Sequence, residues 1–165
     1  MQARVRQTCL FAVVALGLVV VLAGTALAQS SNSMIGIWKL NVAKSKNAAG
    51  TAPQPRTFTI QAAGAGIKHT VDTVNADGTV RRIWEFSGNY DGKDNPITGT
   101  SGNGDVVAAT RFDANTTRYI FKKDGKVTVT QTFVVSANGK TMTVTAASTD
   151  AQGKTVENVR LFEKQ

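Results

Sequence analysis

The sequence predicts an all-β protein that folds as a single antiparallel up-and-down β-barrel of about eight to ten strands. First, runs rich in Thr, Val, Ile and aromatic residues recur about every ten positions after Met34. Second, Gly, Asn and Asp lie between these runs, and these residues tolerate the backbone angles of tight hairpin turns. Third, almost nothing after Met34 follows a helical period, so little or no helix is expected there. A flat sheet of this size would expose two edges, and closing it into a barrel removes them.

Each expected strand is a β-rich run bounded by turn residues. In chain order the expected strands are residues 36–42, 56–62, 67–74, 79–87, 89–93, 106–112, 117–123, 126–136, 140–148 and 155–164. Tight turns such as "NADG" and "SANG" join most of them, which favours pairing between neighbours in sequence. Two longer stretches, 43–55 and 95–104, carry Gly and Pro and are expected to be irregular connections.

Alternation along these strands predicts one apolar face and one polar face. The face expected to point inward comprises Trp38, Leu40, Phe58, Ile60, Val71, Trp84, Phe86, Tyr119, Phe121, Val129, Phe133, Met142, Val144 and Phe162. In 126–136 and 140–148 the opposite face is nearly all threonine, which suits a solvated strand surface.

The N-terminal residues have the features of an export signal. Arg4 and Arg6 precede the uncharged, mostly apolar stretch 10–24, and "ALA" at 26–28 offers small residues to a signal peptidase. We therefore expect residues 1–28 to be a signal peptide cleaved between Ala28 and Gln29. Residues 29–34 would form a short flexible segment and 35–165 the barrel domain, in the periplasm or outside the cell. The alternative is an uncleaved anchor, although the apolar run is shorter than the roughly 20 residues that span a bilayer.

Charge and cysteine content limit the classes of partner. Loss of Arg4 and Arg6 with the signal lowers the formal net charge from +8 to +6. A basic surface can favour anionic lipids, polysaccharide or acidic small molecules, or serve solubility alone. No clustered Lys/Arg stripe with interleaved aromatics points to nucleic acid. Cys9, the only cysteine, falls within the signal, which excludes disulfides and thiolate catalysis in the mature chain.

The sequence offers no recognisable catalytic or metal-binding group. His69 is the sole histidine, so a zinc site or a second haem ligand has no partner residue, and we expect no cofactor. Most acids, including Asp77, Asp91 and Asp124, lie in turn-like sequences, where their side chains bond to turn backbone. No carboxylate pair or activated nucleophile can be inferred, so no catalytic residue is assigned.

The two ends of the expected barrel carry a family resemblance. "GIWKLN", followed by a strand meander and ended by "NVRLFEKQ", resembles the calycin superfamily of lipocalins and fatty-acid-binding proteins, and above all small secreted bacterial lipocalin-like proteins. The resemblance implies that Gly36 and Trp38 form the Gly-x-Trp motif of the first strand. The indole would then plug one end of the barrel, and Arg160 from the last strand would pack across it. A guanidinium over an indole is worth roughly 0.5–2 kcal/mol.

The ligand site of fatty-acid-binding proteins is matched only in part. There an Arg-x-Tyr pair holds the ligand carboxylate; Arg160 matches the arginine, but Phe162 replaces the tyrosine. The second arginine of that site has no counterpart in its strand, where Gln131 is the nearest polar residue. The paired lid helices also have no counterpart, because 43–55 is short and carries Gly and Pro.

We therefore expect a monomeric exported barrel that binds a small apolar or amphiphilic molecule, including anionic ones, as a lipid carrier or sequestering protein. It would not insert stably in a membrane after cleavage. The candidate ligand-binding residues are His69, Arg82, Trp84, Phe86, Tyr119, Gln131, Phe133, Arg160 and Phe162. The alternative is an envelope interaction protein whose filled barrel binds through its loops. A weaker third hypothesis is a cyclase- or isomerase-like barrel enzyme.

Overall fold

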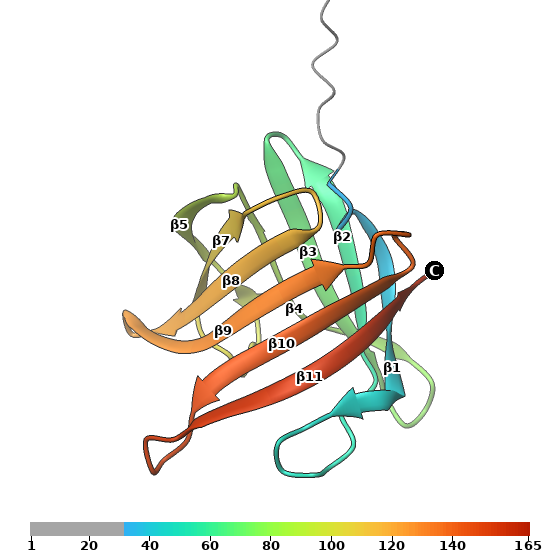
Figure 1. The fold of residues 1–165 in the computed structure, drawn as a ribbon, viewed down its shortest axis with the longest axis vertical. Coiled ribbons are helices and arrows are strands. Elements are labelled where there is room, and N and C mark those ends of the chain that lie inside the picture. Colours follow the sequence, from blue (N-terminus) through green and yellow to red (C-terminus); the bar gives the residue numbers. More distant parts are fainter. Residues whose placement is uncertain (1–31) are drawn as a thin grey trace, which may run out of the picture.

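The computed structural model describes residues 32–165, and the expected signal peptide at 1–28 lies outside the described residues. Within 32–165 every regular element is a β-strand, so no helix there is long and apolar enough to cross a membrane. Eleven strands form one antiparallel sheet that curls into a nearly closed barrel (Figure 1). The predicted fold class is confirmed, with one strand more than the expected eight to ten.

The strand boundaries follow the predicted runs closely. They are β1 Gly36–Lys46, β2 Thr57–Ala63, β3 Gly66–Val74, β4 Val80–Gly88, β5 Asp91–Pro96, β6 Thr98–Gly99, β7 Val106–Arg111, β8 Thr116–Lys123, β9 Lys126–Val135, β10 Thr141–Thr149 and β11 Thr155–Lys164. The main differences fall in the stretches expected to be irregular, and β5 also extends to Pro96 from the expected end at 93. The short strand β6 lies in 95–104, and β1 continues four residues into 43–55. Each segment gains backbone pairing with a neighbouring strand, which residue preferences alone do not reveal.

The first and last strands meet, as barrel closure requires. The strand order is β5-β7-β8-β9-β10-β11-β1-β2-β3-β4-β6, and β1 pairs with both β2 and β11. The two ends of this order are β5 and β6, and the ladder is open between them. Across the barrel interior, the Phe86 ring of β4 meets the Tyr119 ring of β8 edge-to-face at a centroid distance of 5.3 Å.

The core lies on the face that alternation predicted. All but one of the expected inward residues are buried, and Val129 packs against the core while partly exposed. On the opposite face of β9 and β10 the threonines are partly exposed. Parity along each strand therefore predicted the core correctly wherever the ladder is regular.

Candidate functional site

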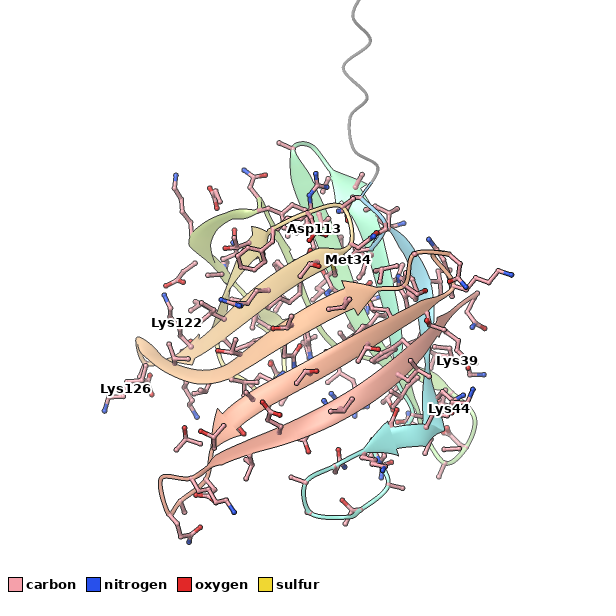
Figure 2. The ribbon with its side chains drawn as sticks, in the orientation of Figure 1. Met34, Lys39, Lys44, Asp113, Lys122 and Lys126 are labelled. Carbon is pink, nitrogen blue, oxygen red and sulfur yellow. The ribbon has the colours of Figure 1, made fainter. Side chains whose placement is uncertain are left out.

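One end of the barrel is closed by Trp38. Its side chain is fully buried, and its Nε1–H donates a hydrogen bond to the Met34 carbonyl at 2.8 Å. Met34 lies at the end of the barrel where β1 begins, and Figure 2 labels it there. The Lys164 ammonium lies 5.0 Å from the indole centroid, within cation–π distance.

Gly36 is required by this closure. Its φ of +141° is one that residues with a side chain rarely adopt, and a Cβ built there would lie 2.6 Å from Cε of Lys164. The lysine stem thus crosses the bare glycine backbone on its way to the indole. The Gly-x-Trp motif therefore provides both the plug and the passage for the cation above it.

The cation over Trp38 is Lys164, and the prediction that Arg160 would lie there is wrong. The β1–β11 register pairs Trp38 with Lys164 and Leu40 with Phe162. Arg160 lies four residues earlier on β11, roughly 13 Å along the strand. Both cations share the inward parity of Phe162, so parity could not distinguish them, whereas the register does.

The centre of the barrel is filled with aromatic rings. The tyrosine ring of Tyr119 lies 4.5 Å from Phe133 and 5.7 Å from His69, centroid to centroid. Trp84 and Phe86 stack at 6.3 Å, and Gln131 is buried on β9 opposite Tyr119. Six residues predicted to contact ligand thus lie together in the core, but they pack against one another.

His69 is a neutral imidazole enclosed by this cluster. Its Nδ1 lies 3.3 Å from the Tyr119 hydroxyl, and its Nε2 has no hydrogen-bond partner among residues 32–165. Burial lowers the pKa of His69 from 6.5 to about 3, because the surrounding rings cannot solvate the imidazolium. Burial likewise raises the pKa of the Tyr119 phenol well above its ordinary value.

Arg82, a candidate ligand-binding residue, lies on the outer surface and does not line the barrel interior. The β3–β4 ladder pairs Val71 with Trp84 but Asp72 with Arg82, so that Ile83 forms a bulge. A bulge adds one residue to one strand, which reverses the facing of the residues beyond it. Arg82 Nε donates to Asp72 at 2.5 Å, and its Nη1 donates to Glu85.

The opposite end of the barrel, where β1 ends and β11 begins, carries an open cavity. After Asn41, β1 no longer pairs with β11 in regular register. The Ser45 hydroxyl forms hydrogen bonds to both strands there. It donates to the Asn41 carbonyl at 2.6 Å and accepts from the Leu161 N–H at 3.0 Å. Lys44, labelled in Figure 2, marks this part of β1. Beyond it, the Ala48 N–H donates to Asn158 Oδ1 at 2.8 Å.

This arrangement leaves a cavity of about 510 Å³ between β11 and the chain that follows β1. We call this cavity the mouth; its lining residues are Asn47, Ala48, Ala49, Thr51, Val156, Asn158 and Arg160. In Figure 1 the loop after β1 lies beside the start of β11. A second cavity of similar volume lies against the same loop and the end of β1, from Val42 to Ala52.

Two half-buried arginines belong to this end of the barrel. Arg160 donates from Nη2 to Asn47 Oδ1 at 3.4 Å, and the Arg56 carbonyl accepts from the Leu40 N–H at 2.9 Å. Burial lowers the pKa of both guanidinium groups, and the positive charge of Arg56 lowers the pKa of Arg160 further. Sequence reasoning missed Arg56, although it shares the parity of Phe58 and Ile60.

Among residues 32–165 no three His, Cys, Asp or Glu side chains gather as a metal site would require. Of the predicted ligand-binding residues, Arg160 alone lies on the wall of the mouth. Phe162 lies deeper, fully buried and stacked on Phe58.

Comparison with known proteins identifies the fold. The zebrafish ileal bile acid-binding protein, crystallised with cholic acid, is similar at a TM-score of 0.51 and 14% identity, over 81% of this chain and 99% of that one. The siderocalin Ex-FABP, described as functioning through dual ligand specificities, gives a TM-score of 0.32 and 12% identity, over 81% of this chain and 71% of its own. No protein-family model and no curated protein sequence matches the chain. With its nearly closed antiparallel barrel, the chain has the calycin fold.

Proposed function

We propose that this protein is an exported, monomeric barrel that binds a small apolar or amphiphilic molecule in its mouth. The observation that carries the proposal is the cavity of about 510 Å³ between Asn47–Thr51 and β11. Its volume falls in the range of pockets that hold one small molecule, roughly 300–1,000 Å³. Ala48, Ala49 and Val156 provide apolar wall, while Asn158 and Arg160 provide polar groups that can orient a ligand. The zebrafish protein of the same fold was solved with cholic acid, an amphiphile, which agrees with this class of ligand.

Native mass spectrometry of protein purified from its own host should detect a complex heavier than the polypeptide. Organic extraction should then release the bound molecule and leave the polypeptide mass. The Val156→Trp variant should lose the retained molecule, because the indole fills the mouth from its wall. Val127→Trp, at an exposed position on β9, is the matched control and should keep it. A bare polypeptide mass for the wild type, with nothing extracted, would contradict the proposal.

A second candidate function is an envelope interaction protein that binds through its loops. The aromatic packing at the barrel centre favours it, because side chains already occupy that part of the interior. The same native spectra separate the two candidates. An apo protein that captures a macromolecular partner would support the second.

The N-terminal residues also support export of the protein. Measuring the intact mass of the mature chain tests whether the signal peptide is removed. The mature chain should begin at Gln29 and be recovered from the periplasm or the medium, because Ala26 and Ala28 present the small residues that the peptidase reads. An Ala28→Arg variant should be processed poorly and serves as the control. Recovery of wild-type chains that retain residues 1–28 in a membrane fraction would refute cleavage.

A further inference from the structure

The turn between β7 and β8 contains an acceptor sequence for N-glycosylation. Asn115, Thr116 and Thr117 form the pattern Asn-x-Thr, in which the middle residue is not proline. No other position in the sequence has this pattern. Asp113, two positions before the asparagine, also satisfies the longer pattern with an acidic residue that some transferases require. Such a short pattern recurs by chance, so the surrounding structure has to show whether it can act.

The turn holds its backbone firmly and leaves the asparagine side chain available. Oδ1 of Asp113 accepts hydrogen bonds from the N–H groups of Asn115 and Thr116, each at 2.7 Å. The Asn115 carbonyl accepts from the Val135 N–H at 2.9 Å. The Asn115 side chain, in contrast, is partly exposed and has no hydrogen-bond partner among residues 32–165. Figure 2 labels Asp113 in this turn, near Met34 at the closed end of the barrel.

The third residue of the pattern has a hydroxyl that the fold does not use. The Thr117 side chain is 1% exposed, and its Oγ1 has no hydrogen-bond partner among the described residues. Burying a hydroxyl without a partner costs free energy, and valine offers a similar branched shape without that cost. Thr117 pairs with Phe133 on β9 and shares the inner face of β8 with Tyr119. Packing therefore gives no reason for a hydroxyl at this position, whereas the acceptor sequence requires one.

We propose that Asn115 carries an N-linked glycan in the exported protein and that the transferase recognises the Thr117 hydroxyl. The donor is an oligosaccharide joined to a polyprenyl diphosphate. Nδ2 of Asn115 forms a bond to C1 of the first sugar, and the bond between C1 and the diphosphate oxygen breaks. The diphosphate leaves with the electron pair, and the amide nitrogen loses one proton. The step is a substitution and needs no oxidant or reductant.

Burial of Thr117 sets the order of glycosylation and folding. In the folded protein its hydroxyl lies on the inner face of β8, where no enzyme can contact it. The glycan is therefore added before β8 pairs with β7 and β9. After folding, the glycan extends from the closed end of the barrel, and the mouth at the other end stays open. The inference rests on the proposed export, because transfer takes place on the outer side of the membrane.

Peptide mass spectrometry of protein purified from its own host tests the proposal. Trypsin releases residues 112–118 as one peptide, because an arginine ends each side of it. The wild-type peptide should carry the added mass of whole sugar residues on Asn115. Asn115→Gln and Thr117→Val should abolish the added mass. Thr117→Ser should keep it, since the hydroxyl remains, and so should Thr116→Val, the matched control at the middle position of the pattern.

Urea denaturation separates recognition by the transferase from a structural role of the hydroxyl. Wild type and Thr117→Val are both produced without the signal peptide, so that neither is glycosylated. The valine variant should then unfold at a higher urea concentration than the wild type, because the unpartnered hydroxyl is gone. A lower midpoint for the variant would show that Thr117 supports the fold, and its assigned role would be overturned.

The remaining outcomes separate this inference from the proposed export. A wild-type chain that begins at Gln29 and yields only the unmodified peptide 112–118 keeps export and overturns the glycan. Added sugar mass in Asn115→Gln or in Thr117→Val also overturns the assignment. A wild-type chain that retains residues 1–28 and carries no sugar contradicts both. Ligand retention in the mouth is a separate measurement, because a covalent glycan remains on the chain after organic extraction.

Discussion

Replacing Trp38 with alanine is expected to lower the free energy of unfolding by about 3–5 kcal/mol, the usual cost of deleting a fully buried large aromatic side chain. The indole is completely buried, and its hydrogen bond to the Met34 carbonyl would also be lost. Urea denaturation of the two proteins, monitored by circular dichroism, measures the difference. Ile37→Ala is the control, because Ile37 is the next residue on β1 but is 48% exposed and should cost much less.

A double-mutant cycle tests which cation lies over the indole. Lys164→Ala alone should cost less than Trp38→Ala, since a largely exposed lysine loses one cation–π contact worth about 0.5–1 kcal/mol. The Trp38→Ala/Lys164→Ala protein should lose less than the two single losses added, because the shared contact is broken only once. The pair Trp38→Ala/Arg160→Ala should be additive. Additivity for Lys164 together with coupling for Arg160 would show that the register at the end of the barrel is wrong.

Acidification from pH 7 to pH 5 is expected to destabilise the fold through His69. The pKa of this imidazole is about 3 in the folded state and about 6.5 when exposed, so above pH 6.5 neither state binds the proton. As the pH falls below 6.5, His69 becomes protonated in the unfolded state. In the folded state it is not protonated until the pH approaches about 3. Stability should therefore fall by about 1.4 kcal/mol per pH unit across this window, about 2 kcal/mol by pH 5.

Denaturant melts of wild type and His69→Phe at several pH values isolate this effect. Phenylalanine preserves an aromatic ring between Phe58 and Tyr119 but does not titrate, so the variant should show a much flatter profile between pH 7 and pH 5. Asp77, Glu85 and Asp113 have lowered pKa values, and their contributions are lost mainly below pH 5 in both proteins. Identical slopes for the two proteins in this window would show that His69 is solvated in the folded state.

Parity predicted the core of the candidate site but not its open part. His69, Trp84, Phe86, Tyr119, Gln131 and Phe133 face inward as the alternating pattern indicated. The same pattern failed for Arg82, because the bulge at Ile83 reverses its facing and the outer carboxylates of Asp72 and Glu85 hold it there. A bulge depends on how two strands pair, and no residue in "TVRRIWEFS" marks its position.

The sequence by itself determined the all-β class, the strand positions, the buried face and the meeting of the first and last strands. The first three features are local or depend on a period of two residues, and the meeting of the two end strands follows from closing the sheet into a barrel. Only the tertiary structure decided that Lys164 covers Trp38, that Arg82 points outward, and that Arg160 lies on the wall of the mouth. Each of these depends on register between strands distant in sequence, where a shift of one residue reverses a face and a shift of four moves a charge from one end of the barrel to the other.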